Sequence, residues 1–321
     1  MTVRNKVMSA DAAVSKFVQR GQHLSLGGFT INRNPMALTH ELIRQEISNL
    51  HISMHSGSQA MDLLIGAGLV DIVEIAYGAN GRLASTCIRF RKAVENDSIE
   101  IEDYSNYQMT LRFMAGAMGV PFLPTYSGLS TDIVKRWGLD ENQRRSNPSL
   151  PLKKCVSAEN PFSVDQEEVL LIPAAELDVS LIHVHTASRD GTARIEGLSF
   201  ADIEQARAAK RVILSCEELV PPRVLRNEPC RNFIPHVLVD AVIVQPFGAY
   251  PTACYRSYDY DMNYLAKYAK LAQNDTTFEE YLQSSILSAI DFDDYLDNVG
   301  EKTLERLRAD SKLGYPRRRH D

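Results

Sequence analysis

The sequence predicts an α/β fold, an open, doubly wound and mostly parallel sheet with a C-terminal helical annex. Three observations predict it. Short apolar strands alternate with segments of helical periodicity, small and polar residues follow several strands, and residues 259–310 are acidic with few turn residues. With 321 residues, 44% hydrophobic and 24% charged, the chain can bury a sizeable core. We expect residues 1–258 to form the α/β domain and residues 259–321 to form an annex packed on it.

The N-terminal elements are predicted as helix, strand and helix. Residues 10–20 and 36–43 carry apolar side chains at helical spacing, and residues 23–26 alternate like a short buried strand. Between that strand and the second helix stands Gly27-Gly28-Phe29-Thr30. Two glycines let the backbone approach a ligand closely, and the helix start adds partial positive charge. The segment predicts a corner suited to a negatively charged oxygen, with a plain tight turn as the alternative.

The later strands are expected in two series. The first has strands at residues 51–54, 73–76 and 99–102, and the second has strands at 169–172, 181–186, 212–216 and 241–244, with a helix at 200–209. In open parallel sheets, ligands bind beyond the carboxyl ends of the strands. We therefore expect Ser56–Gln59 and the loop containing Asn80 to share one crevice with Gly27 and Gly28. Residues 135–165 are interpreted as an excursion within one domain.

Composition excludes several classes of function. The formal net charge of -6 offers no basic field for nucleic acid or for an anionic membrane. Five cysteines lack any Cys-x-x-Cys spacing, which argues against a zinc site and against a disulfide framework. No leader peptide or membrane-spanning segment is recognised, so we expect a cytoplasmic protein. Neither a Gly-x-Gly-x-x-Gly after a strand nor a P-loop motif is present.

Several short motifs together resemble one family. They are Gly27-Gly28-Phe29 with Arg33 and Pro35, Pro121-Phe-Leu-Pro124, Gly248-Ala-Tyr-Pro251 and Tyr258-Asp-Tyr-Asp261. Along residues 10–314 the chain resembles the alpha subunit of family I CoA-transferases of the glutaconate type. The resemblance implies an enzyme that moves CoA between an acyl-CoA and a free carboxylate such as acetate. The acyl-CoA would be dicarboxylic, like glutaconyl-CoA, or short-chain.

The resemblance also implies where the nucleophile lies. These enzymes form a glutamyl-CoA thioester on a glutamate of the beta subunit, within a Ser-Glu-Asn-Gly type motif, and this chain has no such motif. We therefore expect no catalytic nucleophile in this chain, a partner beta subunit in a hetero-dimer or larger hetero-oligomer, and CoA as a substrate without a separate cofactor. Two alternatives stay open. One is a partner-dependent acyl-CoA hydrolase or decarboxylase, such as the ring-opening hydrolase of steroid catabolism, and the other is a non-catalytic effector-binding domain.

The resemblance singles out two further places in the chain. Ser127 and Gly128 match a loop that borders the acyl site, although a simple Ser-Gly turn is the alternative. Asn106 falls where the transferases carry glutamine and the ring-opening hydrolase carries glutamate. An asparagine amide can polarise a carbonyl but cannot act as a base, which favours transfer. Alternatively, Asn106 only begins a helix capped by Asp103 or Ser105. The expected substrate-binding residues are Gly27, Gly28, Phe29, Thr30, Asn80, Asn106, Ser127 and Gly128.

Two polar pairs have the residue types of catalytic or metal-binding sites. His183 and His185 lie two apart on a strand and share a face, but no third ligand is evident at a useful spacing, so we assign no metal. Glu217 and Glu218 follow a strand, and arginines at positions 223, 226 and 231 could pair with them. We interpret both pairs, and Tyr258–Asp261, as structural.

Overall fold

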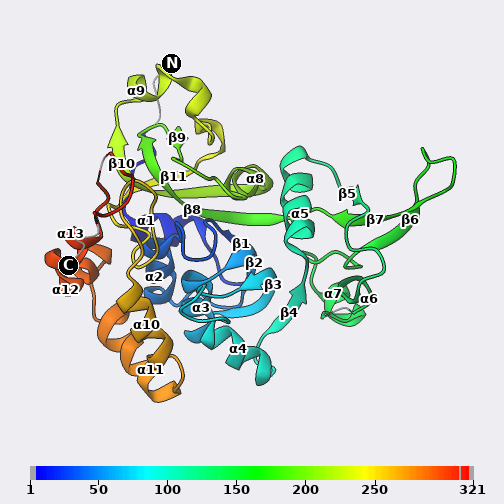
Figure 1. The fold of residues 1–321 in the computed structure, drawn as a ribbon, viewed down its shortest axis with the longest axis horizontal. Helices are drawn as coiled ribbons and strands as arrows, with labels where there is room; N and C mark the ends of the chain where they lie inside the picture. Colours follow the sequence, from blue (N-terminus) through cyan, green and yellow to red (C-terminus); the bar gives the residue numbers. More distant parts are fainter. Residues whose placement is uncertain (1–4, 137, 311, 318–321) are drawn as a thin grey trace.

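The computed structural model describes residues 5–136, 138–310 and 312–317, and its main sheet has the predicted doubly wound form (Figure 1). The strand order is β11-β10-β8-β1-β2-β3-β4, and every neighbouring pair along this path is parallel. The strands are β1 His23–Leu26, β2 Leu50–Gly57, β3 Val70–Gly78, β4 Glu100–Asp103, β8 Leu177–Ser188, β10 Ala209–Val220 and β11 Ala241–Val244. A short strand, β9 Ala193–Arg194, pairs antiparallel with β8.

The order of the strands places a switch point beside β1. The chain first runs outward from β1 to β4 and later returns to β8, on the other side of β1. Ligands in open α/β sheets bind where the strand order reverses, outside the carboxyl ends of the strands. The topology therefore points to the loops that follow β1 and β8 as the place of a ligand site.

Helices cover both faces of the main sheet. On one face α1 Ala10–Phe17, α2 Met36–Arg44, α3 Gln59–Gly66 and α4 Ile88–Glu95 pack successively, and α5 Asn106–Met118 packs against α8 Asp202–Ala208 on the other. Strand alternation separates the two faces. Leu24, Leu26, Ile52 and Met54 enter the large apolar core with α1–α4. The alternate positions beneath α5 are buried and polar, and include His23, Ser25, His51 and Ser53.

The C-terminal helices share that large core. They are α10 Met262–Leu271, α11 Asp275–Tyr281, the π-helix Leu282–Leu287, α12 Phe292–Val299 and α13 Glu301–Leu307. Tyr268, Phe278 and Phe292 are buried in the same cluster as the α2 and α3 side chains. The Tyr268 hydroxyl also donates to the Asp62 carboxylate of α3 at 2.8 Å. The division at residues 258 and 259 stays a prediction, and the ends of the two expected parts, residues 1–4 and 318–321, lie outside the described residues.

A second, smaller sheet corrects one prediction. Its order is β5-β7-β6, with β5 Phe122–Thr125, β6 Val156–Glu159 and β7 Glu168–Pro173, and both pairings are antiparallel. The predicted strand at residues 169–172 therefore exists but does not belong to the main parallel sheet. Together with α6 Asp132–Lys135 and α7 Glu141–Ser146, this sheet forms residues 120–175, here called the arm, which projects sideways beyond β4 and α5 (Figure 1).

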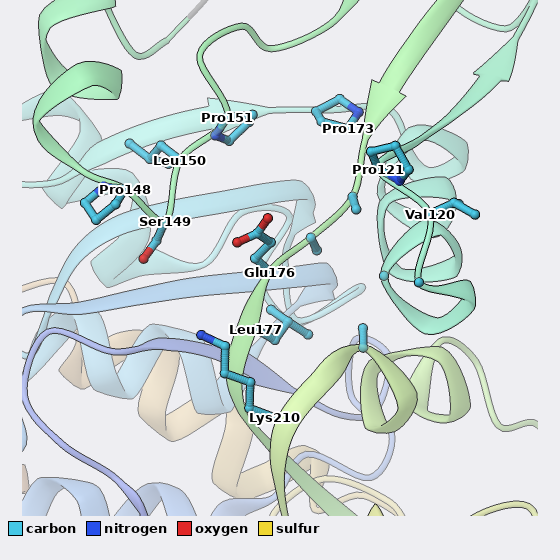
Figure 2. A pocket seen from close by; sticks show the side chains of 15 residues that line it. Val120, Pro121, Pro148, Ser149, Leu150, Pro151, Pro173, Glu176, Leu177 and Lys210 are labelled. Atoms are coloured by element: carbon cyan, nitrogen blue, oxygen red, sulfur yellow. The ribbon is translucent and has the colours of Figure 1, made fainter.

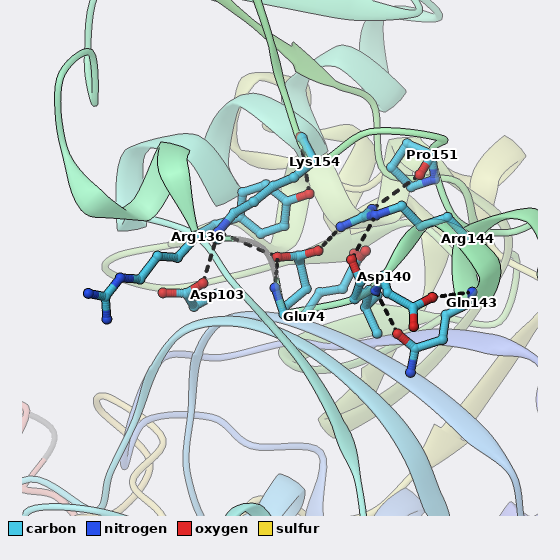
Figure 3. Close-up of polar contacts among 12 residues, drawn as sticks. Glu74, Asp103, Arg136, Asp140, Gln143, Arg144, Pro151 and Lys154 are labelled. Atoms are coloured by element: carbon cyan, nitrogen blue, oxygen red, sulfur yellow. Dashed lines mark hydrogen bonds and ion pairs between the residues drawn. The ribbon is translucent and has the colours of Figure 1, made fainter.

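Buried charges attach the arm to the main sheet (Figure 3). The Glu102 carboxylate of β4 is fully buried and is paired with the Arg144 guanidinium and with Lys154 Nζ, the latter at 3.4 Å. Lys154 Nζ also donates to Asp103 Oδ1 at 2.8 Å, and Arg144 donates to the Pro151 carbonyl at 3.1 Å. Because removing one partner of a buried pair leaves an uncompensated charge, these contacts fix the base of the arm firmly.

The remaining short helices connect β10 to β11. They are α9 Pro222–Arg226 and the 3₁₀ segments Pro229–Arg231 and His236–Leu238. Among the described residues, no helix is both long enough and apolar enough to cross a membrane.

Candidate active site

The loop between β1 and α2, here called the β1–α2 corner (residues 27–35), has a tightly constrained backbone. Gly28, Thr30 and Arg33 have positive φ values of +85°, +46° and +49°. A side chain at Gly28 would place its Cβ 2.3 Å from the Asn32 carbonyl oxygen, so only glycine fits there. Non-glycine residues in this conformation are uncommon and cluster at functional sites.

The amides of the corner do not play the role that the sequence suggested. The N–H groups of Gly27, Gly28, Phe29 and Thr30 donate to Leu181 O, Asp202 Oδ1, Asn32 O and Ser56 O at 2.8–3.1 Å. The expectation that they face a substrate oxygen is therefore wrong for this conformation. The glycines instead permit a tight turn, and their place in a substrate-binding site stays a prediction.

The start of α2 is likewise engaged within the chain. Its first amides donate to Asn34 O, Gly248 O and Pro35 O, at 2.8, 3.0 and 2.9 Å. The helix begins at Met36, well past the glycines, so its positive end does not lie at the predicted oxygen site.

A buried ion pair holds the corner against α8. Arg33 Nη1 lies 2.5 Å from Asp202 Oδ2 and donates to His183 O at 3.1 Å, while Nη2 donates to Leu198 O at 2.9 Å. Both charged side chains are buried, and Asp202 also accepts the Gly28 amide. The pair therefore joins the loop after β1 to the start of α8, across the switch point.

Four side chains from three elements meet beside this corner. The rings of Phe29 and His55 lie 5.4 Å apart, His55 Nδ1 is 3.0 Å from Ser56 Oγ, and Ser56 Oγ donates to Asn106 Oδ1 at 3.4 Å. Burial lowers the pKa of His55, so its imidazole is neutral at pH 7. Asn106 is exposed, and its amide oxygen faces Ser56, which leaves the amide N–H groups to face outward. This group is a polar patch able to bind a carbonyl oxygen.

Three other predicted residues, Asn80, Ser127 and Gly128, lie outside this hydrogen-bonded group. Asn80 is buried, and its Nδ2 donates to Gln59 Oε1 at 3.1 Å, at the ends of β3 and β2. Gly128 lies against the side chain of Gln108, and Gln108 is one half-turn along α5 from Asn106. Ser127 is exposed. Ser127 and Gly128 follow the end of β5, a strand of the smaller antiparallel sheet in the arm.

The structure confirms one of the two interpretations of Asn106, that it begins a helix, and its part in substrate binding stays a prediction. Ser105 is the N-cap of α5 and forms a capping box with Gln108, as one alternative anticipated. Asn106 is therefore the first helical residue, and its side chain remains available at the carboxyl edge of the sheet.

The histidines of β8 have partners that the sequence did not reveal. His183 Nε2 lies 2.6 Å from Glu217 Oε1, and the Glu217 carboxylate also accepts the Tyr258 hydroxyl and the Phe247 amide at 2.8 and 2.9 Å. Glu217 therefore does not pair with the arginines considered above. Arg231 pairs with Glu196 and Glu228 instead.

Among the residues that the structure describes, two buried or partly buried groups have the residue types of metal sites. Donor atoms of His183, Glu217 and Cys254 lie within 4.8 Å of one another, whereas His185 is not part of this group and its Nε2 lies 2.7 Å from the Tyr255 carbonyl oxygen. His183 is already hydrogen-bonded at both nitrogens, and burial raises the pKa of the Cys254 thiol, which keeps it protonated. His183 and Glu217 are therefore already engaged with each other, and the protonated Cys254 thiol is a poor metal ligand.

The second group lies beneath α5. It combines His23, His51 and Glu74, and the two imidazole rings stack at 3.6 Å. Burial would raise the pKa of Glu74, but Arg112, whose Nη2 lies 2.8 Å away, and the two histidines lower it to about 2. A divalent cation would add two positive charges beside Arg112, so this group fits a buried ion pair better than a metal site.

A cavity of about 530 Å³ lies elsewhere (Figure 2). It opens at the amino ends of β8 and β10, where Glu176 and Lys210 line it together with Pro121 and Pro151. None of the predicted site residues lines it. The carboxyl ends of the strands have their own cavity, of about 340 Å³, which Asn32 and Arg33 of the β1–α2 corner help to line.

Sequence reasoning missed three residues of this edge. His55 was not recognised at the end of an apolar strand, although an imidazole just before a polar loop was a usable signal. Phe200 was expected in a helix, but α8 begins at Asp202 and Phe200 has φ +51°. Nothing local marks Asp202, because its partner Arg33 is 169 positions away in the sequence.

The chain is similar to known proteins over nearly all its length. A family model described as coenzyme A transferase matches residues 7–245. The A subunit of glutaconate CoA-transferase from Acidaminococcus fermentans is 36% identical over 311 residues, covering 97% of each chain. A crystal structure of glutaconate coenzyme A-transferase from the same organism gives a TM-score of 0.94 at 36% identity and covers 97% of this chain and 98% of that chain.

Other relatives have different names. The cholesterol ring-cleaving hydrolase IpdA subunit of Rhodococcus jostii is 28% identical over 292 residues, or 90% of this chain and 94% of that one. A crystal structure of the decarboxylase AibA/AibB gives a TM-score of 0.70 at 29% identity and covers 88% of this chain and 100% of that one. The family match and the similarity to the glutaconate enzyme confirm the resemblance seen in the motifs, and the chain belongs to the coenzyme A transferase family, with the alpha subunit of the glutaconate enzyme as its counterpart.

Proposed function

We propose that this chain is the alpha subunit of a hetero-oligomeric CoA-transferase. The enzyme would move CoA between an acyl-CoA, either dicarboxylic like glutaconyl-CoA or short-chain, and a free carboxylate such as acetate. Coenzyme A takes part as a substrate, and the proposed reaction needs no separate cofactor. The observation that carries the proposal is the polar patch of Phe29, His55, Ser56 and Asn106 at the carboxyl edge of a transferase-family sheet.

The carboxylates nearest this edge are committed to other contacts. Asp202 binds Arg33 and the Gly28 amide, and Glu217 binds His183, Tyr258 and the Phe247 amide. Neither is free to attack a thioester. The nucleophilic glutamate is therefore expected on a partner beta subunit whose surface faces this edge.

The proposed chemistry exchanges CoA through that glutamate. Its carboxylate attacks the acyl thioester and displaces CoA thiolate, which leaves a mixed anhydride. The thiolate then attacks the glutamyl carbonyl, which releases the first acid and forms a glutamyl-CoA thioester. The acceptor carboxylate takes the CoA by the same two steps in reverse order, so no water and no external oxidant is consumed.

Asn106 has a defined part in this scheme. Because its Oδ1 accepts from Ser56, its Nδ2 can donate to the acyl carbonyl oxygen, where negative charge develops in the transition state. Neutral His55 would fix Ser56, whose hydroxyl orients the amide. Phe29 and Thr30 would border the acyl group, with Gly27 and Gly28 fixing their backbone. Ser127 and Gly128 would bound the acid from the arm, and Asn80 would support the loop after β2.

The test is a transfer assay on the chain purified together with its partner subunit. Glutaconyl-CoA or crotonyl-CoA and labelled acetate should give labelled acetyl-CoA with the complex, and each of the two chains by itself should be inactive. Asn106→Ala should lower kcat/KM by about 10²–10³, the loss typical for one oxyanion donor. Asn96→Ala, at an exposed position at the end of α4, is the matched control and should leave the rate unchanged. Full activity in Asn106→Ala would contradict the assigned role.

One observation favours hydrolysis as a second candidate. A neutral, half-buried imidazole at position 55 could accept a proton from water, which Asn106 cannot do. In that case the complex would release free CoA from acyl-CoA with no labelled acetyl-CoA. His55→Gln would then abolish the release of CoA, whereas a transferase would lose only part of its rate.

A further inference from the structure

The residues that line the cavity at the switch point indicate which acyl groups it would accept. It measures about 340 Å³ and lies between the β1–α2 corner and the loop from β9 to α8, with Asn32, Arg33, Leu198, Phe200, Tyr255 and Tyr315 among its lining. This volume falls in the range of small-molecule sites. Its position between the loops after β1 and β8 is where an open α/β sheet binds its ligand.

The cavity adjoins the polar patch through one aromatic side chain. Phe29 stacks on Phe200 of the cavity wall, with centroids 4.8 Å apart and planes 12° apart. The Phe29 ring also contacts His55, at 5.4 Å. A thioester carbonyl bound at Asn106 would therefore have its acyl tail directed along Phe29 toward the cavity.

The charged side chains of this wall are already neutralised. The Arg33 guanidinium is 2% exposed and engages Asp202, His183 O and Leu198 O. Glu196, which also lines the cavity, pairs with Arg231 at 2.7 Å. Arg256 is exposed one residue past Tyr255 but does not line the cavity. No lining residue in the described chain therefore offers an uncommitted cation to a carboxylate.

The rest of the wall is mostly aromatic, and its uncharged polar groups are Asn32 and the hydroxyls of Tyr255 and Tyr315. Tyr255 and Tyr315 meet edge to face at 5.6 Å, and Leu198 is 73% exposed at the rim. Gly197 makes this arrangement possible, because a Cβ there would lie 2.7 Å from the Tyr255 ring. Aromatic walls without a free cation favour an apolar tail, and they desolvate a second carboxylate without pairing it.

We propose that this cavity holds the acyl tail and selects monocarboxylic acyl groups with an apolar or aromatic end over dicarboxylic ones. The proposal rests on the proposed CoA transfer and narrows its substrate class. It predicts that this chain differs in preference from an enzyme that acts on glutaconyl-CoA.

A matched pair of substrates tests the proposal on the complex of both subunits. Crotonyl-CoA is glutaconyl-CoA with the distal carboxylate replaced by hydrogen, and phenylacetyl-CoA adds an aromatic end. We expect kcat/KM for both to exceed that for glutaconyl-CoA by about tenfold or more, because an unpaired carboxylate is poorly accommodated. Leu198→Arg, which adds a cation at the exposed rim, should shift the ratio toward glutaconyl-CoA by about tenfold, whereas Leu198→Gln should not.

Binding gives a second readout that does not depend on turnover. Phenylacetate should bind the complex more tightly than glutarate by calorimetry, and Leu198→Arg should reverse that order. A preference for glutaconyl-CoA and glutarate in the unchanged complex would overturn the proposal. If the complex transfers CoA from none of these acyl-CoA substrates but still binds phenylacetate more tightly than glutarate, the proposed CoA transfer is wrong and the assignment of the cavity stands.

Discussion

At the residue scale, Gly28 is the position where the fold of the corner is most sensitive. Gly28→Ala should destabilise the protein by about 1–2 kcal/mol from the left-handed backbone, and by about 1–3 kcal/mol more from the clash with Asn32 O. Chemical denaturation of the purified chain measures this loss. Activity of the complex should fall with it, since Phe29 and Arg33 are held by the same turn.

Gly21 provides the matched control for that substitution. Its φ is +79°, close to that of Gly28, but a Cβ there would meet nothing within 4 Å. Gly21→Ala should therefore show only the backbone part of the loss and keep full activity. Equal losses for the two variants would show that the clash at Gly28 is relieved by local movement.

Sequence patterns located this corner but not its contacts. Two glycines between a strand and a helix that is preceded by a proline indicate a tight turn, and the structure has that turn. The direction of its amides depends on Asp202 and Ser56, which come from distant segments. Asn106 was singled out by the family resemblance. The N-cap of its helix was predicted from the local sequence, in which Ser105 precedes the helix. His55 and Phe200 join the site only because β2 and the loop before α8 fold beside Phe29.

At the element scale, the contact between α3 and α10 should depend on pH. Burial raises the pKa of Asp62 from 3.8 to about 6, although the Phe90 amide and the Tyr268 hydroxyl both donate to its carboxylate. A carboxyl group with a raised pKa binds its proton more tightly in the folded state. The contribution of Asp62 to the free energy of unfolding therefore falls as pH rises from about 4 to 6. Above pH 6 the folded protein bears the full cost of a buried, ionised carboxylate.

Asp62→Asn should remove that pH dependence. The variant should gain stability relative to the unchanged protein by roughly 3 kcal/mol between pH 4 and pH 7.5, at about 1.4 kcal/mol for each pKa unit. Denaturant titrations at both pH values measure the difference. Asp97→Asn, on the exposed turn after α4, is the control and should give no such gain. A constant difference across this range would show that Asp62 is ionised throughout.

The arm carries an exposed apolar surface, which we expect the partner subunit to contact. Phe162 and Val164, between β6 and β7, are 94% and 98% exposed, and a cavity of about 430 Å³ beside them is lined by Phe122, Tyr126 and Leu171. Exposed apolar patches of this kind mark interaction sites. Changing Phe162 and Val164 to serine should weaken association with the beta subunit by about 30-fold or more, with the isolated chain folding normally.

A second exposed apolar residue tests whether that effect is specific. Ile290, on the C-terminal annex, is 87% exposed. Ile290→Ser should leave association unchanged when the two subunits are titrated by analytical ultracentrifugation. Loss of association with Ile290→Ser but not with the arm variant would place the interface on the annex.

The positions of the strands were predicted better than the sheet to which each strand belongs. Strands β1 to β4, β8, β10 and β11 were all expected, because apolar runs between helical segments identify them. The strand at 169–172 was also expected, but an apolar run does not specify which sheet it joins. Its pairing with β5 is set by antiparallel contacts between residues about fifty positions apart, such as Phe122 with Pro173.

At the scale of the whole molecule, we propose that the chain supplies half of a site. The carboxyl edge of its sheet carries the Asn106 amide, the neutral His55 imidazole and an aromatic wall, whereas the carboxylates of Asp202 and Glu217 are held in contacts within the chain. The family match and the similarity to a glutaconate CoA-transferase along the whole chain accord with this division of labour. The central claim is that the covalent step takes place on the partner.

Intact-mass measurement of both subunits tests that claim most directly. The complex would be incubated briefly with crotonyl-CoA or glutaconyl-CoA and no acceptor acid, with a borohydride-treated sample beside it. We expect the partner to gain the mass of CoA less water, this chain to be unchanged, and acetate to discharge the adduct as acetyl-CoA. Borohydride should remove the thioester. An adduct on this chain, or free CoA accumulating with no adduct on either of the two chains, would contradict the account.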